Sequence, residues 1–144
     1  MAKKNLYVSF DYENDKHYKF MLEAWDANPN FDFRFSDKSA QEINSENIDR
    51  IKAGLTSKIK ESTHLLVIIG EEANTKHPDS DLIGDINWIN WEINKAKELD
   101  KKLIAVKINK NYESPDAILN SGASWAMCFK PEPIMKAISN PSSG

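Results

Sequence analysis

The run His64-Leu65-Leu66-Val67-Ile68-Ile69-Gly70 is the most continuous apolar segment of the 144-residue chain. Its length and its β-branched residues predict a strand. Polar residues do not alternate with the apolar ones, which is typical of a strand covered on both faces, as in a parallel sheet. We therefore place residues 64–70 in the middle of a parallel sheet.

Strand and helix patterns alternate on both sides of this run. Further strands are predicted at 5–10, 31–35, 102–108 and 124–129, and helices at 17–27, 46–62, 87–96, 114–121 and 131–138. Asp15 and Ser45 are the expected N-terminal caps of the first two helices. This alternation, with right-handed crossovers, predicts an α/β fold of flavodoxin-like type, a doubly wound parallel five-stranded sheet with helices on both faces. We expect one domain over 1–139 and a disordered tail at 140–144.

The composition narrows the class of protein. Hydrophobic residues make up 40% of the chain and charged residues 28%, as in ordinary globular domains, and no apolar run is long enough to span a membrane. A net charge of −3 without a dense Lys/Arg block argues against nucleic acid as a partner. The first residues show no apolar signal region, so we expect a cytoplasmic protein. The single Cys128 lies in an apolar run and is expected in the core.

In a doubly wound sheet, ligands bind at the carboxyl ends of the strands, where the strand order reverses. This rule selects residues 10–14, 36–40 and 71–92. The turn after the first strand contains no glycine, and the chain has only five glycines, so a dinucleotide-binding loop and a P-loop are both improbable. A phosphoacceptor receiver domain would end its third strand on aspartate, whereas this chain has Gly70-Glu71.

The long segment 71–85 contains a possible metal-binding pattern. Its imidazole and carboxylate groups are His77, Asp79, Asp81 and Asp85. The segment lacks the glycine and the spacing of a calcium-binding loop, so a solvated acidic loop is the favoured interpretation and no metal site is predicted. No G-x-S-x-G pattern supports a nucleophilic serine, and neither His17 nor His64 is assigned a catalytic role.

The helix at 87–96 carries Trp88 and Glu92 four residues apart, which stacks them on one side of its apolar stripe. Two interpretations are open. By spacing alone, the favoured one is that Trp88 packs on the domain while Glu92 is solvated and pairs with Lys95 or Lys97. The other is that this edge forms the wall of a pocket and that Glu92 carries the chemistry.

A lone carboxylate is a poor tool for ordinary glycoside hydrolysis, which needs a second acid to protonate the leaving oxygen. The nicotinamide–ribose bond of NAD has a cationic leaving group and needs no such acid. Its cleavage requires stabilisation of an oxocarbenium-like ribose, which a positioned carboxylate provides. Trp88 and Trp91 would offer flat apolar surfaces to nicotinamide or adenine.

Several stretches of the chain resemble the TIR domain superfamily, in particular the TIR-like family that includes the TIR protein of the bacterial Thoeris anti-phage system. The first strand contributes Tyr7-Val8-Ser9-Phe10-Asp11-Tyr12, and Phe35-Ser36-Asp37-Lys38 stands where TIR domains have their BB loop. Residues 62–70 resemble the third strand and 103–106 the fourth. Trp88-Ile89-Asn90-Trp91-Glu92-Ile93 is similar to the Trp-x-x-x-Glu motif of the TIR αC helix.

The resemblance implies an NAD glycohydrolase or ADP-ribosyl cyclase with Glu92 as the catalytic residue. It implies a lining of Phe10, Asp11 and Ser36 at the mouth, with Trp88 and Trp91 on the ribose and nicotinamide side. NAD would be the substrate, with no permanently bound cofactor. The product would be a cyclic or conjugated ADP-ribose that activates a separate effector, and activation would involve self-association. A non-catalytic adaptor that acts by homotypic assembly, and a nucleotide-binding sensor without turnover, are the alternatives.

Overall fold

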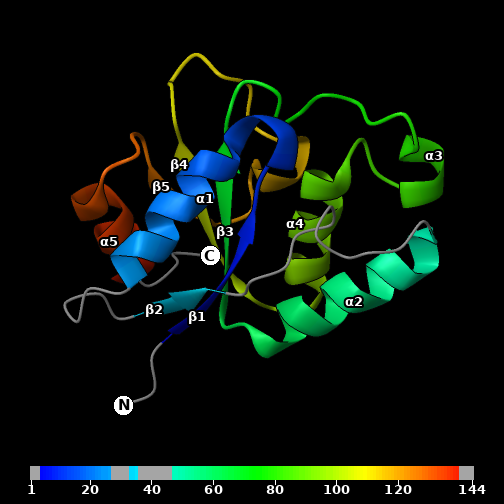
Figure 1. The fold of residues 1–144 in the computed structure, drawn as a ribbon, viewed down its shortest axis with the longest axis horizontal. Helices are drawn as coiled ribbons and strands as arrows, with labels where there is room; N and C mark the ends of the chain where they lie inside the picture. The colour runs from blue at the N-terminus through cyan, green and yellow to red at the C-terminus, as the bar shows by residue number, and fades with distance from the viewer. Residues whose placement is uncertain (1–3, 27–32, 36–46, 140–144) are drawn as a thin grey trace.

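The computed structural model describes residues 4–26, 33–35 and 47–139 (Figure 1). Its strands are β1 (Lys4–Ser9), β2 (Phe33–Phe35), β3 (His64–Ile69), β4 (Lys102–Lys107) and β5 (Ser124–Ala126). They form one sheet in the order β2-β1-β3-β4-β5, and every neighbouring pair is parallel. The predicted α/β, doubly wound parallel fold is therefore confirmed. The apolar run at 64–69 lies in the middle and is buried throughout.

Helices cover both faces of the sheet (Figure 1). They are α1 (Tyr12–Asp26), α2 (Ile48–Glu61), α3 (Ser80–Ile83), α4 (Trp88–Glu98), the 3₁₀ helix η2 (Asp116–Ile118) and α5 (Pro131–Ser139). Apolar residues of α2 and α4 form one core with the sheet face that carries Tyr7, Leu65 and Val67. Those of α1 and α5 form a second core with the opposite face, which carries Leu6 and Val8. The alternation along each strand thus divides its side chains between two cores.

The first helix begins earlier than predicted, and Asp15 is not its cap. The backbone N–H of Asp15 donates to the carbonyl oxygen of Asp11 over 2.7 Å, so Asp15 lies within the first turns of α1. Residues 12–14, expected in the turn after the first strand, are therefore part of the helix. In α2 the cap is Asn47, whose side chain accepts from the N–H groups of Asp49 and Arg50. The expected cap Ser45 lies outside the described residues.

Smaller differences occur in the second half of the chain. The long segment after β3 contains the short helix α3, which ends at Gly84 in the left-handed conformation (φ 90°) that glycine adopts without strain. The helix predicted at 114–121 is the single turn η2, and the last strand ends at Ala126. Cys128 is partly exposed and so is not the core residue expected. The predicted tail at 140–144 lies outside the described residues.

Candidate functional site

Glu92 lies on the face of α4 that packs against β1. The hydroxyl group of Tyr7 donates a hydrogen bond to its Oε2 atom, and the hydroxyl group of Ser9 donates to Oε1 over 2.9 Å. Only 3% of Glu92 is exposed. Lys95 pairs instead with Glu98 at 2.9 Å, and the Lys97 ammonium donates to a backbone carbonyl. The interpretation of Glu92 as a solvated, lysine-paired residue is therefore wrong.

The surroundings of Glu92 change its acidity. Burial raises its pKa from 4.5 to about 7, because removal from water disfavours the charged form. The hydrogen bonds from Tyr7 and Ser9 act in the opposite direction, since both stabilise the carboxylate. Glu92 therefore exchanges its proton close to neutral pH, in the range where a functional carboxyl group can change state.

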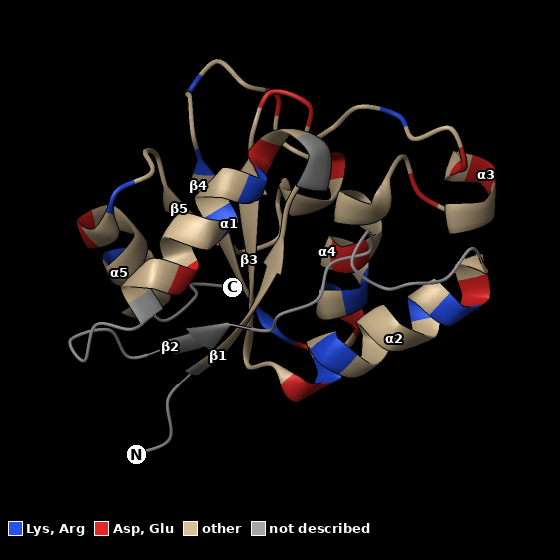
Figure 2. Ribbon diagram, viewed as in Figure 1, with Lys and Arg blue, Asp and Glu red and all other residues tan. Residues whose placement is uncertain are grey.

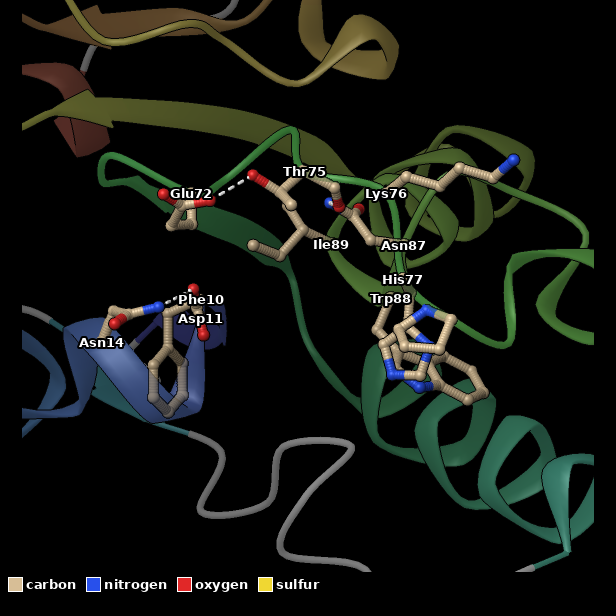
Figure 3. Close-up of a pocket in the computed structure, with 11 residues that line it drawn as sticks. Phe10, Asp11, Asn14, Glu72, Thr75, Lys76, His77, Asn87, Trp88 and Ile89 are labelled. Carbon is tan, nitrogen blue, oxygen red and sulfur yellow. Dashed lines mark hydrogen bonds between the residues drawn. The ribbon is translucent and has the colours of Figure 1, made fainter.

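A cleft of about 380 Å³ opens at the carboxyl ends of β1 and β3 (Figure 3). One side is formed by Phe10, Asp11 and Asn14, from the end of β1 and the start of α1. The other side comes from the segment after β3 and the first turn of α4, with residues Glu72, Thr75–Pro78 and Asn87–Ile89. The cleft lies where the strand order reverses. Residues from two of the three segments selected by the sequence, 10–14 and 71–92, line it.

Phe10, Asp11 and Trp88 are brought together in this cleft, whereas Glu92 is not on its surface. Glu92 follows Trp88 by one helical turn on the same side of α4, roughly 6 Å along the helix axis. The carboxyl group is buried against Tyr7 and Ser9 of β1, the strand that leads to Phe10 in the cleft. Ser36 falls outside the described residues, so its place at the mouth stays a prediction.

Trp91 is also absent from the lining of the cleft and packs against Trp88. Its ring meets that of Trp88 edge to face, with centroids 5.7 Å apart and an interplanar angle of 79°. The ammonium group of Lys95 lies 5.5 Å from its ring centroid. Edge-to-face aromatic pairs are a favoured geometry, so Trp91 supports the orientation of Trp88. In this structure Trp88 alone of the two presents its surface to the cleft.

A buried asparagine network holds the far wall of the cleft. The side chain of Asn87 caps α4 by accepting from the N–H of Asn90, and it donates to the carbonyl oxygens of Ala73 and Thr75 at 3.0 and 2.9 Å. Asn90 in turn accepts from the N–H of Ala117. The capping role of Asn87 was recognisable in the sequence, because asparagine favours that position. Its hydrogen bonds to Ala73 and Thr75 could not be recognised in the sequence.

The segment after β3 shows no metal-binding arrangement. Nδ1 of His77 accepts a hydrogen bond from the backbone N–H of Asp79, and Asp85 accepts one from the side chain of Asn94. Within the described ranges, no three His, Cys, Asp or Glu side chains gather closely enough to hold an ion. His77 instead lines the cleft, a position that its sequence context did not indicate.

A parallel sheet of this order, with a switch-point cleft beside a Trp-x-x-x-Glu helix, has the features of a TIR-like domain. The sequence matches the family model described as "Thoeris protein ThsB, TIR-like domain" over residues 7–113. The chain therefore belongs to this family. The matched span contains β1 from Tyr7 onward, the residues that line the cleft, and Glu92. A search of curated proteins found no match.

Three solved structures are similar to this chain at low sequence identity. The TIR domains of the activated Roq1 resistosome, which directly recognises the pathogen effector XopQ, share 16% identity over 73% of this chain and 57% of that chain (TM-score 0.48). The 2-desoxiribosyltransferase from Leishmania mexicana shares 12% sequence identity, over 80% of this chain and 76% of that chain (TM-score 0.49). A prokaryotic SEFIR domain shares 18% sequence identity, over 94% of this chain and 88% of that chain (TM-score 0.49). None of the helices in the described part of this chain is long and apolar enough to cross a membrane.

Proposed function

We propose that this Thoeris TIR-like domain cleaves NAD at the nicotinamide–ribose bond, with Glu92 stabilising the positive charge that develops on the ribose. The observation that supports this most directly is the buried Glu92 carboxyl group, which Tyr7 and Ser9 fix one helical turn from Trp88 in the wall of the cleft. A structural surface glutamate would have no need of two hydroxyl donors on a neighbouring strand. A preorganised carboxylate in a site shielded from water acts strongly on a developing cation.

The cleft has the size and the chemistry expected for part of a dinucleotide. Its volume of about 380 Å³ falls within the range of small-molecule sites. Phe10 and Trp88 offer apolar surfaces for flat rings, while Asn14 and Thr75 offer groups that bind hydroxyls. Nicotinamide leaves as a neutral molecule from a cationic ring, so the reaction needs no proton donor at the leaving nitrogen. NAD is thus a substrate that a site with one carboxyl group can process.

The protonation state of Glu92 is compatible with NAD cleavage. With a pKa near 7, the residue is partly protonated at neutral pH in the absence of substrate. A cationic nicotinamide ring nearby lowers the pKa of a carboxyl group, because opposite charges favour the ionised form. Bound NAD would therefore generate the carboxylate that its own cleavage requires. Because Glu92 does not line the cleft, its contact with the ribose requires a rearrangement of the cleft wall, and self-association on activation is the proposed cause of that rearrangement.

We extend the proposal to the product and the setting. The ADP-ribosyl group released from nicotinamide would be cyclised or conjugated, and the resulting nucleotide would activate a separate effector protein. The reaction would take place in the cytoplasm, where NAD is available. The family membership supports this setting through the Thoeris system, whose TIR proteins the resemblance associates with such signals.

The test compares the purified wild-type chain with Glu92→Gln and with the control Glu98→Gln, which alters an exposed residue of the same helix. Nicotinamide release from NAD is measured by chromatography, in dilute solution and at crowding concentrations that favour assembly. We expect release by wild type and Glu98→Gln and at least a hundredfold less by Glu92→Gln. Mass spectrometry of small molecules from infected cells identifies the product. Equal release by wild type and Glu92→Gln would refute the proposal.

The adaptor alternative is favoured by one observation, the absence of Glu92 from the surface of the cleft. A domain that acts by homotypic assembly has no need of an accessible carboxylate. It should form concentration-dependent oligomers and signal normally as Glu92→Gln. Signalling in infected cells by that variant, measured beside wild type, separates the two functions.

A further inference from the structure

We propose that a second pocket, adjoining the cleft, binds a small organic cation of the alkylguanidinium class through Asp15. The pocket has a volume of about 290 Å³ and is bordered by α1, by the segment after β3 and by the segment after β4. Its lining includes Asn14, Asp15, Tyr18, Glu71, Glu72 and Tyr112. Asn14 and Glu72 line the cleft as well, so the two sites share a wall.

Asp15 is the unusual residue of this pocket. Only 5% of it is exposed, and its Oδ2 atom has no hydrogen-bond partner within the described part of the chain. A buried carboxylate without a partner is costly, because it loses its hydration and gains nothing in return. A cation in the pocket would offset the negative charge of this carboxylate.

The backbone makes room for this carboxyl group at the end of β3. A Cβ atom placed on Gly70 would lie 2.0 Å from Oδ2 of Asp15, far inside van der Waals contact. The side chain of Asp15 thus lies directly against the backbone of a glycine. Any other residue at position 70 would displace the carboxyl group, so the pair Asp15 and Gly70 fixes the position of the acid in the pocket wall.

The charge of the pocket favours a cation. Glu71 and Glu72 add two carboxylates, and His17 is the one basic side chain among the described residues that line the pocket. Figure 2 shows the acidic colour on the loop after β3, at the end of the sheet where α1 begins. The hydroxyl of Thr75 donates to Glu72 and orients it. Together these groups produce a negative potential that attracts a positive ligand.

The geometry favours an organic cation over a metal ion. In the described ranges no group of three carboxylate or imidazole side chains is close enough to ligate a metal. A guanidinium ion needs one carboxylate, to which it donates two parallel hydrogen bonds, and it stacks on aromatic rings. Tyr18 and Tyr112 provide such rings in the lining. A short alkyl stem fits the remaining volume.

The affinity should depend on pH. Burial and the charge of Asp11 raise the pKa of Asp15 from 3.8 to about 6, while His17 opposes this shift. The other titratable groups that line the pocket are His17, Tyr18, Glu71, Glu72 and Tyr112. Because the carboxylate binds the cation and the neutral acid does not, affinity is full above pH 6 and falls as the pH drops through it.

The test is calorimetric titration of the full chain with n-butylguanidinium, with the neutral isostere n-butylurea as control. We expect binding of the cation only, at least tenfold weaker binding by Asp15→Asn, and unchanged binding by Glu132→Gln, which removes one acid on the distant α5. Glu71→Gln, an exposed change that leaves the core intact, should weaken binding several-fold. Glu92→Gln should bind as wild type does, which separates this site from NAD cleavage.

Three results would overturn the proposal. Equal binding of n-butylurea would show that charge is not recognised. Full affinity in both Asp15→Asn and Glu71→Gln would place the ligand elsewhere. The third result is that Mg²⁺ or Ca²⁺ binds, that Asp15→Asn abolishes this binding, and that n-butylguanidinium does not compete with it. The ligand of the pocket would then be a metal ion and not an organic cation.

Discussion

Replacing Glu92 with Gln should flatten the dependence of stability on pH. The pKa of Glu92 is about 7 in the folded protein, against an ordinary 4.5. The folded state therefore holds the proton more tightly than the unfolded state does. The contribution of Glu92 to the free energy of unfolding is complete below pH 4.5 and is lost as the pH rises through 7.

The magnitude follows from the shift. One pKa unit corresponds to about 1.4 kcal/mol, so the Glu92 contribution to the free energy of unfolding should fall by about 2–3 kcal/mol between pH 5 and pH 8.5. Glutamine has a similar shape and does not titrate. Between pH 5 and pH 8.5 the free energy of unfolding of Glu92→Gln should therefore fall less than that of wild type, by this amount. Asp15 also titrates in part of this range, but it is the same in both proteins and cancels in the comparison.

The assay is urea denaturation, followed by tryptophan fluorescence at a series of pH values. Glu98→Gln is the matched control, because the Glu98 side chain is 68% exposed and lies about 1.7 turns further along α4. Its curve should coincide with that of wild type. Parallel curves for wild type and Glu92→Gln would refute the argument, because they would show that burial has not shifted the acidity of this group.

Three further predictions concern Gly70, Asn87 and Ser9. Gly70→Ala should destabilise the fold by about 1–3 kcal/mol through overpacking against Asp15, and adding Asp15→Ala should recover most of that loss in urea denaturation. Asn87→Ala should cost about 2 kcal/mol, because α4 loses its cap and two loop carbonyls lose their donor, and hydrogen exchange should accelerate in the loop before the helix. Ser9→Ala should raise the pKa of Glu92 above 7 in an NMR titration of its carboxyl carbon, since the bond that it removes favours the carboxylate.

The sheet was predictable because its signals are local. The apolar run at 64–69 is buried on both faces, and a strand of that kind has few places in an α/β fold other than the centre. The start of α1 was not predictable in the same way. An aspartate just before an apolar periodic segment indicates an N-terminal cap. A sequence whose helix begins earlier, with a polar first turn that contains the aspartate, looks the same. Asp15 lies inside the helix in this way.

The site was predictable only in part, for a related reason. Helical spacing placed Trp88 and Glu92 on one side of α4, and the fold class placed that helix at the switch point. Spacing within one helix says nothing about what packs on it. The burial of Glu92 depends on two hydroxyl groups of β1, and the position of Trp91 behind Trp88 depends on the packing of α4 against the sheet.

The bonds from β1 to Glu92 also have a consequence for how the protein is made. They join residues 85 and 83 positions apart in the chain, so they close loops of more than half its length. During synthesis Tyr7 and Ser9 leave the ribosome long before their acceptor exists. Contacts of such sequence separation form late in folding, after the entropy of closing the loop has been overcome. A nascent chain that ends before α4 holds no assembled site, and the finished fold alone brings carboxyl and hydroxyl groups together.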